Sequence, residues 1–450
     1  MRLLRHFPLL APAALLGLAA VVAAEARHAQ DPPPPAPPTG QDITVVLQGN
    51  QRPLIRLAFP RLAGASLAGA GAQAAAELEA TLRADLAAAR IFEIQGPEAL
   101  TALTLTGDPA KDFLQYQSLG NEILLQGEFK QESDRLVLEG RLVDLKSGQA
   151  IVGKRYRSQF SLARRIAHTF ADEIVLFFTG RRGVALTTIA FYSDRDGGNK
   201  EIFLMDADGA NQRRITGHKS ISMSPAWRGA DSIAYVSFFN GPPGIYLVDL
   251  ASGRKSPLIN DGSLNISPSY SPDGARIVFT RSLAGNTEIF SADAGGGNLR
   301  RLTHSAGIDT NPAWSPSGRE IAFTSSRAGN PHIYVMDAEG ANVRRITFSG
   351  EYNDGAAWRS EGTQIAYASR RGAAFNIAVT DLVTLESRTL TSGGGSKESP
   401  SFSPDGRRIA FAWRTGGSQQ IYLMGADGTE PQKLTSQGDN YGPDWSGYPK

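Results

Sequence analysis

Few residues in this chain have the types and spacing that nucleotide binding or catalysis requires. A dinucleotide-binding fingerprint is matched by Gly69-Ala70-Gly71-Ala72-Gln73-Ala74, with Glu93 about 20 residues further on. That fingerprint acts as the tight turn between a strand and a helix, because its backbone has to approach a pyrophosphate closely. About nine residues separate these glycines from the preceding predicted strand. The match therefore does not predict a nucleotide site.

The metal-binding and nucleophile patterns are also incomplete. The turns Asp206-Ala207-Asp208-Gly209 and Asp337-Ala338-Glu339-Gly340 begin like a calcium loop, but they lack the glycine at the sixth position and the closing glutamate. The six histidines include no pair spaced i, i+4. The chain has no cysteine, which excludes disulfides, thiol catalysis and cysteine-held zinc, and it has no Gly-x-Ser-x-Gly elbow. We therefore expect a protein that is not an enzyme and that binds no cofactor and no metal.

A segment of about 44 residues, which repeats six times between Ile189 and Trp445, dominates the sequence. Each copy has four short runs rich in Ile, Val, Phe and Tyr, separated by turns that contain Gly, Asp, Asn or Pro. A period of about 40 to 45 residues with four strands is typical of propeller blades. An aromatic residue marks the register at spacings of 43 or 44 residues: Trp227, Tyr270, Trp314, Trp358, Phe402 and Trp445. We predict a six-bladed β-propeller of WD40-like repeats, preceded by a smaller α/β domain.

The phase of the repeat predicts how the ring closes. The array begins at a second strand, Ile189-Ala190-Phe191, and stops at a first strand, Pro443-Asp444-Trp445-Ser446. The C-terminal strand should therefore pair with the first three strands of the array and complete blade 1. Closure of this kind removes the exposed sheet edges that would otherwise template aggregation.

The two faces of the predicted propeller carry different turns. One face has short turns of the Ser-Pro-Asp-Gly and Asp-x-Asp-Gly types, and the other has longer and more varied connections. Variation on one face of a repeat array usually marks the binding face. Five residues before each register aromatic stands a polar residue, expected near the mouth of the central channel: Ser222, Asn265, Asp309, Asn353, Lys397 and Asn440. The alternative is that these residues only shape the turns.

The N-terminal residues indicate export. Residues 1–26 have the layout of a signal peptide, with two arginines, an apolar stretch from Phe7 to Ala24 and small residues at the candidate cleavage sites. A membrane anchor is less favoured, because the apolar part is short and ends in Glu25 and Arg27. Residues 27–41 include DPPPPAPPTG and form a predicted semi-rigid tether. The net charge of +2 leaves no field that would recruit nucleic acid or anionic lipid.

Residues 42–180 are predicted to form the α/β domain, and residues 181–450 the propeller. Leu78, Leu82 and Leu86 recur at i, i+4, i+8 in one predicted helix, Gln73 to Arg90. A second stripe consists of Leu162, Ile166, Phe170, Ile174 and Phe177. The candidate strands are Ile43 to Leu47, Leu54 to Phe59, Ile91 to Ile94, Ile123 to Phe129, Arg135 to Asp144 and Ala150 to Tyr156.

From about Asp42 to its end, the chain resembles the TolB family of the Tol-Pal envelope system of Gram-negative bacteria. The resemblance is carried by four segments and by the repeat Ile-Tyr-x-Met-Asp followed by Arg-Arg-Ile-Thr. The segments are Gly153-Lys154-Arg155-Tyr156, Arg164-Arg165-Ile166-Ala167-His168, Ala171-Asp172-Glu173-Ile174 and Thr179-Gly180-Arg181-Arg182-Gly183-Val184. The proline-rich tether departs from the family pattern, in which the N-terminal segment begins the mature chain.

The resemblance implies a monomeric periplasmic docking protein that supports outer-membrane invagination at the division site. It implies that the lipoprotein Pal binds at the propeller mouth, and that the inner-membrane protein TolA binds the N-terminal segment. The segment of this chain that matches is Asp42, Ile43, Thr44, Val45, Val46 and Leu47, an extended run suited to strand addition on a partner's sheet edge.

Two classes of function remain open at the level of the sequence. A non-catalytic docking protein is favoured, because no catalytic constellation is complete. The alternative is a metal-dependent hydrolase of the lactonase type at the channel mouth, with Asp309, Asn353 and Asn440 as oxygen ligands. Under the docking hypothesis, charge reversal at Asp309 should weaken the binding of Pal and leave thermal stability unchanged.

Overall fold

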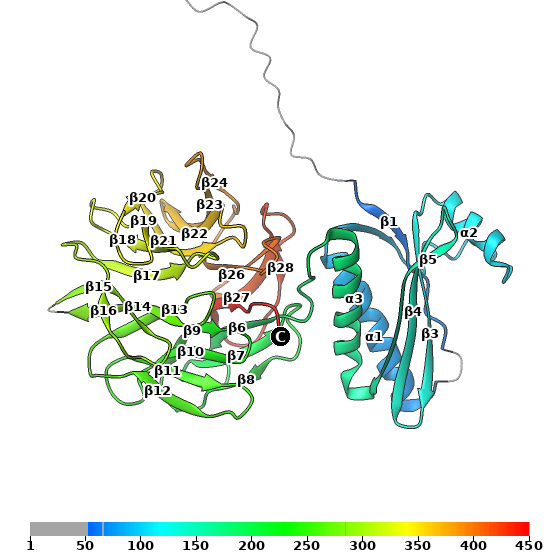
Figure 1. Cartoon of the computed structure of the whole chain (residues 1–450), viewed down its shortest axis with the longest axis horizontal. Coiled ribbons are helices and arrows are strands. Elements are labelled where there is room, and N and C mark those ends of the chain that lie inside the picture. Colours follow the sequence, from blue (N-terminus) through cyan, green and yellow to red (C-terminus); the bar gives the residue numbers. More distant parts are fainter. Residues whose placement is uncertain (1–52, 65–66, 284, 450) are drawn as a thin grey trace, which may run out of the picture. The chain divides into compact units, whose positions relative to one another are not determined.

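The computed structural model describes residues 53–64, 67–283 and 285–449. The predicted signal peptide, the predicted tether and the candidate segment Asp42 to Leu47 lie outside the described residues. Within them, an α/β domain is followed by a six-bladed β-propeller, which confirms the predicted fold class (Figure 1). No helix of the described part is both long and apolar enough to cross a membrane.

A five-stranded sheet with strand order β2-β1-β3-β4-β5 forms the centre of the α/β domain. Its strands are β1 (Ile55–Ala58), β2 (Phe92–Gln95), β3 (Ile123–Glu132), β4 (Arg135–Asp144) and β5 (Gln149–Gln159). β1 pairs in parallel with β2 and β3, whereas β3, β4 and β5 form an antiparallel meander. The helices α1 (Gly69–Ala88) and α3 (Ala163–Thr179), the latter preceded by the short helix η1 (Phe160–Leu162), pack in one core with this sheet. The predicted stripe of α3 is buried at Ile166, Phe170 and Ile174, whereas its two ends, Leu162 and Phe177, are exposed. Leu78, Leu82, Phe170 and Ile174 are fully buried there.

Two local features of this domain differ from expectation. α1 begins at Gly69, so the glycines of the apparent nucleotide fingerprint form the first turn of a helix that starts well after β1 has ended at Ala58. A further helix, α2 (Pro109–Ser118), was not predicted. Asp108 caps it by accepting a hydrogen bond from the Ala110 N–H at 3.1 Å. The Asp-Pro pair at its start was the available signal, because proline is favoured at the first helical position.

The propeller consists of six four-stranded antiparallel sheets. In order from the channel outward, blade 1 contains β29 (Asn440–Trp445), β6 (Thr188–Ser193), β7 (Glu201–Asp206) and β8 (Arg213–Arg214). Blade 2 contains β9 (Ser222–Arg228), β10 (Ser232–Ser237), β11 (Gly244–Asp249) and β12 (Lys255–Ile259), and blade 3 contains β13 (Asn265–Tyr270), β14 (Arg276–Leu283), β15 (Asn286–Asp293) and β16 (Arg300–Arg301). Blade 4 contains β17 (Asp309–Trp314), β18 (Glu320–Ser325), β19 (His332–Asp337) and β20 (Arg344–Arg345). Blade 5 contains β21 (Tyr352–Trp358), β22 (Gln364–Arg371), β23 (Ala374–Asp381) and β24 (Ser387–Thr389), and blade 6 contains β25 (Lys397–Phe402), β26 (Arg408–Thr415), β27 (Ser418–Gly425) and β28 (Gln432–Lys433).

The C-terminal strand closes the ring, as the phase of the repeat predicted. β29 pairs antiparallel with β6, with Asn440 opposite Ser193 and Trp445 opposite Ile189. The Trp445 indole N–H donates to the Thr187 hydroxyl at 2.8 Å, and its backbone N–H donates to the Ser401 hydroxyl of blade 6 at 2.9 Å. The last strand therefore ties blade 1 to blade 6 as well as completing blade 1.

The recurring threonine of the Arg-Arg-Ile-Thr repeat has a structural role. In five blades its hydroxyl accepts a hydrogen bond from a backbone N–H of the third strand, at 2.8 to 3.0 Å. These threonines are Thr216, Thr303, Thr347, Thr391 and Thr435. This side-chain hydrogen bond thus holds the segment after the short outer strand against the third strand, beyond the last backbone hydrogen bonds between the two strands.

Three polar residues of α3 lie at i, i+4, i+8: Arg164 and Asp172 contact residues after the α/β domain, and His168 contacts α1 within it. The Arg164 guanidinium donates to Asp208, in the turn after β7, at 2.5 Å. His168 Nδ1 lies 2.7 Å from the Asp85 carboxylate of α1. The Asp172 carboxylate accepts from the Ala185 and Leu186 N–H groups at 2.9 and 3.1 Å, and burial raises the pKa of Asp172 to about 6. These segments of the family resemblance therefore position the start of the propeller.

Candidate functional site

The inner strands of the six blades surround a central cavity of about 330 Å³. Each blade contributes one residue with left-handed backbone, at φ between 49° and 68°, followed in five blades by proline. These lining pairs are Ser224-Pro225, Ser267-Pro268, Asn311-Pro312, Gly355-Ala356, Ser399-Pro400 and Gly442-Pro443. The register of every inner strand shifts at this point, so each pair belongs to a β-bulge.

This ring of bulges was not predicted from the sequence. A non-glycine residue held at positive φ costs of the order of 1 kcal/mol or more and persists where its surroundings fix it. Such bulges occur next to binding and active sites, where they re-aim side chains. The available signal was the Ser-Pro or Asn-Pro pair two residues after four of the six polar candidates, or Gly-Pro at the last copy.

Three carboxylates and three aromatic rings also line the cavity. The carboxylates belong to Asp354, Glu398 and Asp444, and the rings to Tyr192, Tyr352 and Phe375. Burial raises the pKa of Glu398 above its ordinary value. The described residues include no group of three or more His, Asp or Glu side chains arranged to hold a metal ion.

Two of these carboxylates hold adjacent blades together. Asp444 Oδ2 accepts the Trp227 backbone N–H at 2.9 Å, while the Trp227 indole N–H donates to the Asp444 carbonyl at 2.9 Å. Asp354 Oδ1 accepts from Asn311 Nδ2 and from the Thr324 hydroxyl, both at 2.7 Å. The hydrogen bonds of Asp444 therefore join blade 1 to blade 2, and those of Asp354 join blade 5 to blade 4.

Replacement of Asp444 by Asn is expected to remove a pH-dependent loss of stability. Burial raises the pKa of Asp444 to about 7 from an unfolded value near 3.8. The folded state therefore binds the extra proton, and its stability falls as pH rises through this window. Asn is neutral at every pH and does not have to be ionised in the folded state at pH 8. Because Asp444 lines a water-accessible cavity, which reduces the energetic effect of its burial, we expect Asp444→Asn to be more stable than the wild type by only about 1 to 3 kcal/mol at pH 8. At pH 4 the two proteins should be equally stable.

Urea denaturation of both proteins at pH 4, 6 and 8 measures this difference. Asn keeps an oxygen acceptor for the Trp227 N–H, so the joint between the blades is retained. A difference in unfolding free energy that is the same at all three pH values would show that Asp444 does not titrate in this range.

The six polar residues predicted from the sequence lie behind the cavity wall and do not line it. Each stands at the beginning of an inner strand, and all six have an exposed fraction of 0 or 1%. They are Ser222, Asn265, Asp309, Asn353, Lys397 and Asn440. Direct contact with a partner, which we expected at these positions, is therefore not available to their side chains.

These buried side chains instead fix the loops that precede the inner strands. Lys397 Nζ donates to the carbonyls of Ser392, Gly393 and Gly394 at 3.0, 2.7 and 3.2 Å, and burial lowers the pKa of Lys397. Asn353 Nδ2 donates to the Ser349 carbonyl at 2.7 Å. Asn265 and Asn440 likewise donate to carbonyls of their own loops. The alternative interpretation, that these residues shape the turns, agrees with this geometry.

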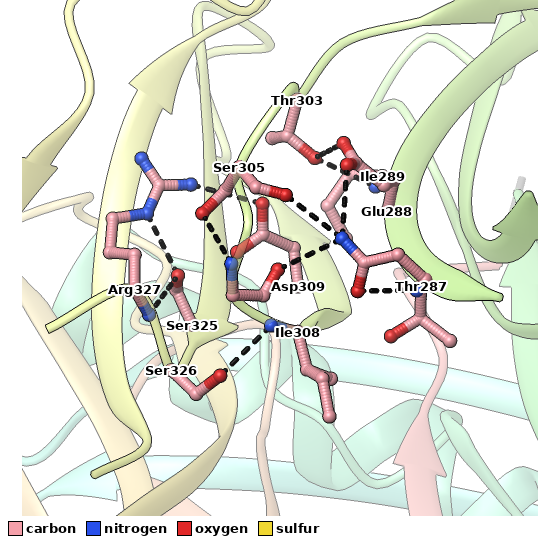
Figure 2. A network of polar contacts seen from close by, with 12 residues as sticks. Thr287, Glu288, Ile289, Thr303, Ser305, Ile308, Asp309, Ser325, Ser326 and Arg327 are labelled. Carbon is pink, nitrogen blue, oxygen red and sulfur yellow. Dashed lines mark hydrogen bonds and ion pairs between the residues drawn. The ribbon is translucent and has the colours of Figure 1, made fainter. Parts of the chain in front are cut away.

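Asp309 shows how such a residue ties the first strand of its blade to the loop that follows the second strand. Figure 2 shows the Arg327 guanidinium reaching the Asp309 carboxylate, with Nη2 and Oδ2 separated by 3.0 Å. Arg327 Nε also donates to the Ser325 hydroxyl at 2.8 Å, and Ser326 Oγ accepts from the Ile308 N–H at 2.9 Å. The second oxygen, Asp309 Oδ1, is buried and has no hydrogen bond among the described residues.

The ligand set of the hydrolase alternative is not formed. Asp309, Asn353 and Asn440 belong to blades 4, 5 and 1, and each is bonded within its own blade or to the adjacent blade. None of the three lines the cavity, so their oxygens do not converge on one ion there.

Comparisons with known proteins cover both parts of the chain. Residues 43–151 match the family described as TolB amino-terminal domain, and residues 177–449 match the TolB beta propeller domain. The Tol-Pal system protein TolB of Desulfosudis oleivorans is 36% identical over 42% of this chain and 42% of its own length. The Protein TolB homolog of Chlorobium chlorochromatii is 33% identical over 41% of this chain and 52% of its own length. The matched region thus spans about half or less of these relatives.

Among solved structures, the crystal structure of TolB from Acinetobacter baumannii superposes with a TM-score of 0.75 and 28% identity. That similarity covers 88% of this chain and 97% of the other. The propeller match alone includes more than half of the residues of this chain. From the order of the two domains, the ring closed by the last strand and these matches, we conclude that the chain belongs to the TolB family, whose members include Tol-Pal system proteins.

Proposed function

We propose that this protein is a periplasmic, non-catalytic docking component of a Tol-Pal system. It binds the lipoprotein Pal at the loop face of the propeller and TolA through residues 42–50, and so supports outer-membrane invagination during division. The observation that carries the proposal is the match to both TolB domains in their family order.

The chemistry of the central cavity supports docking over catalysis. A general acid or base needs a carboxylate free to exchange a proton with substrate. Two of the three cavity carboxylates, Asp354 and Asp444, are instead hydrogen-bonded across the joints between blades, and the third, Glu398, has no second acid, base or nucleophile assigned to it by the sequence. We assign Ser222, Asn265, Asp309, Asn353, Lys397 and Asn440 a positioning role, in which they hold the loops that meet Pal.

Paired substitutions on the two faces of the propeller test this proposal. Ile308 and Phe348 lie on the longer connections and are 56 and 62% exposed, whereas Val383 and Leu385 lie on a short hairpin of the opposite face and are 85 and 42% exposed. Changing Ile308 and Phe348 together to Asp should weaken binding of the soluble domain of Pal from the same organism by about tenfold or more, because apolar contact area is lost and charge is introduced. The same change at Val383 and Leu385 is the matched control.

Isothermal titration calorimetry with the purified, signal-cleaved protein measures the affinities. In a second arm, deletion of residues 42–50 should abolish binding of the periplasmic domain of TolA and leave Pal binding intact. Equal loss of Pal affinity from both faces would contradict docking on the loop face, and the absence of any Pal binding by the wild type would contradict the proposed function.

A further inference from the structure

Four arginines on the loop face of the propeller are already bound to polar groups of this chain. Each guanidinium donates to a carboxylate or an amide oxygen on its own or a neighbouring blade. The pairs are Arg195 with Asn440, Arg281 with Asp261, Arg327 with Asp309 and Arg414 with Gln419. Each of these guanidinium groups therefore already has a polar partner within the chain.

Arg370, in β22 of blade 5, is different. Its guanidinium carbon lies 5.4 Å from the centre of the Tyr352 ring and 5.6 Å from that of Phe375. The two rings meet edge to face, with centres 5.6 Å apart. Among the described residues no carboxylate pairs with Arg370, and its buried Nε has no hydrogen-bond acceptor. A charged donor is thus held in place beside the cavity without a partner.

We propose that Arg370 is a binding site for a carboxylate on the docked partner protein, an inference that rests on the docking function proposed above. A guanidinium presents a planar fork of donors that matches a carboxylate and forms charge-assisted hydrogen bonds with it. Arg370 is only partly buried, and none of its side-chain donors has an acceptor among the described residues, so a carboxylate that reaches the accessible edge of the guanidinium gains charge-assisted hydrogen bonds. The rings of Tyr352 and Phe375, which both contact the guanidinium, restrict the arginine before binding, and this reduces the entropy lost on association.

The surroundings favour a single carboxylate delivered by a protein. Tyr352 and Phe375 share the cavity wall with Asp354 and Glu398. These acidic side chains disfavour a phosphate dianion or an anionic membrane surface, which would bring several negative charges to the same place. The Asp354 carboxylate accepts from Asn311 and Thr324, and among the described residues it forms no ion pair with Arg370. One acidic side chain, or a chain terminus, on a partner loop fits this site.

The chain offers a matched control in the next residue. Arg371 is exposed, and among the described residues no aromatic ring stacks on it. We compare wild type, Arg370→Gln, Arg370→Lys and Arg371→Gln in calorimetric titrations with the soluble domain of Pal from the same organism. Arg370→Gln should weaken binding about tenfold, and Arg370→Lys several-fold, because lysine keeps the charge and loses the fork. Arg371→Gln should change the affinity by less than about twofold.

Further measurements decide the source of the anion. Single Asp→Asn and Glu→Gln variants of Pal, combined with Arg370→Gln, should identify one acidic residue whose effect is not additive with that of Arg370. Melting temperatures of all variants verify that each is folded. Wild-type binding that Arg370→Gln does not weaken would overturn this inference alone, whereas absence of wild-type binding would overturn it together with the proposed function. Binding to phosphatidylglycerol vesicles that depends on Arg370, with Pal affinity unchanged, would show that the anion is a lipid headgroup and would also overturn it.

Discussion

Deletion of residues 440–450 is expected to abolish the native, cooperatively folded propeller. The deletion removes β29 and leaves the inner edge of β6 unpaired along Thr188–Ser193. It also removes Trp445, which is 6% exposed and bonded to both blade 1 and blade 6. Loss of one large buried aromatic costs about 3 to 5 kcal/mol, and the strand adds its backbone ladder and the joint of Asp444 with blade 2. That total approaches the whole stability of a typical domain, about 5 to 15 kcal/mol.

Thermal unfolding followed by circular dichroism, together with light scattering after gel filtration, measures the outcome. We expect a broad, low-temperature transition and oligomers, because an unpaired strand edge recruits other chains. Truncation after Ser446 is the control: it keeps β29 and the hydrogen bond from the Thr188 N–H to the Ser446 hydroxyl, so its melting temperature should stay within a few degrees of the wild type. A protein ending at Asp439 that remained monomeric with an unchanged melting temperature would contradict closure by the last strand.

Charge reversal at Asp309 is expected to destabilise the propeller by about 3 to 5 kcal/mol. The sequence predicted unchanged stability, because the position was expected to be exposed. The structure instead places Asp309 at 0% exposure beside Arg327. Asp309→Lys would bury a second cation against that guanidinium, with no carboxylate to neutralise either one. Chemical denaturation of the purified variant measures the change in unfolding free energy.

Two control variants separate charge from packing. Asp309→Asn keeps an acceptor for Arg327 and should cost only about 1 to 2 kcal/mol. Asp309→Lys combined with Arg327→Glu restores opposite charges and should recover part of the loss. If Asp309→Lys unfolds at the same denaturant concentration as the wild type, the buried ion pair does not contribute to stability.

The architecture of the propeller could be predicted because its signals are local and repeated. Turn residues and short apolar runs at a constant spacing specify strands whatever their surroundings, and the first strand-like run, Ile189-Ala190-Phe191, set the phase. The helix α2 was missed for the opposite reason. It is only ten residues long and its one buried side chain is Tyr116, so it presents almost no apolar stripe to detect.

The candidate site could be located from the sequence only as far as its loops. Position within the repeat showed that residues such as Ser222 begin the inner strands, but not which way their side chains face. The bulge at Ser224 interrupts the alternation of the strand, so that Ser222 is buried while Ser224 and Pro225 line the cavity. Arg370 lacks an acidic partner among the described residues because of which side chains surround it in three dimensions, and no local sequence pattern predicts those neighbours.

The pairing of β29 with β6 also sets the order in which the chain can fold. The two strands are about 250 residues apart, so blade 1 stays incomplete until residues 440–445 have left the ribosome and any export channel. Blades 2 to 6 can form their sheets earlier, but the inner edge of β6 stays unpaired until β29 is available, and during that time it can pair with strands of other chains. Mutations that slow the docking of β29 should therefore lower the yield of soluble protein more than they lower its final stability.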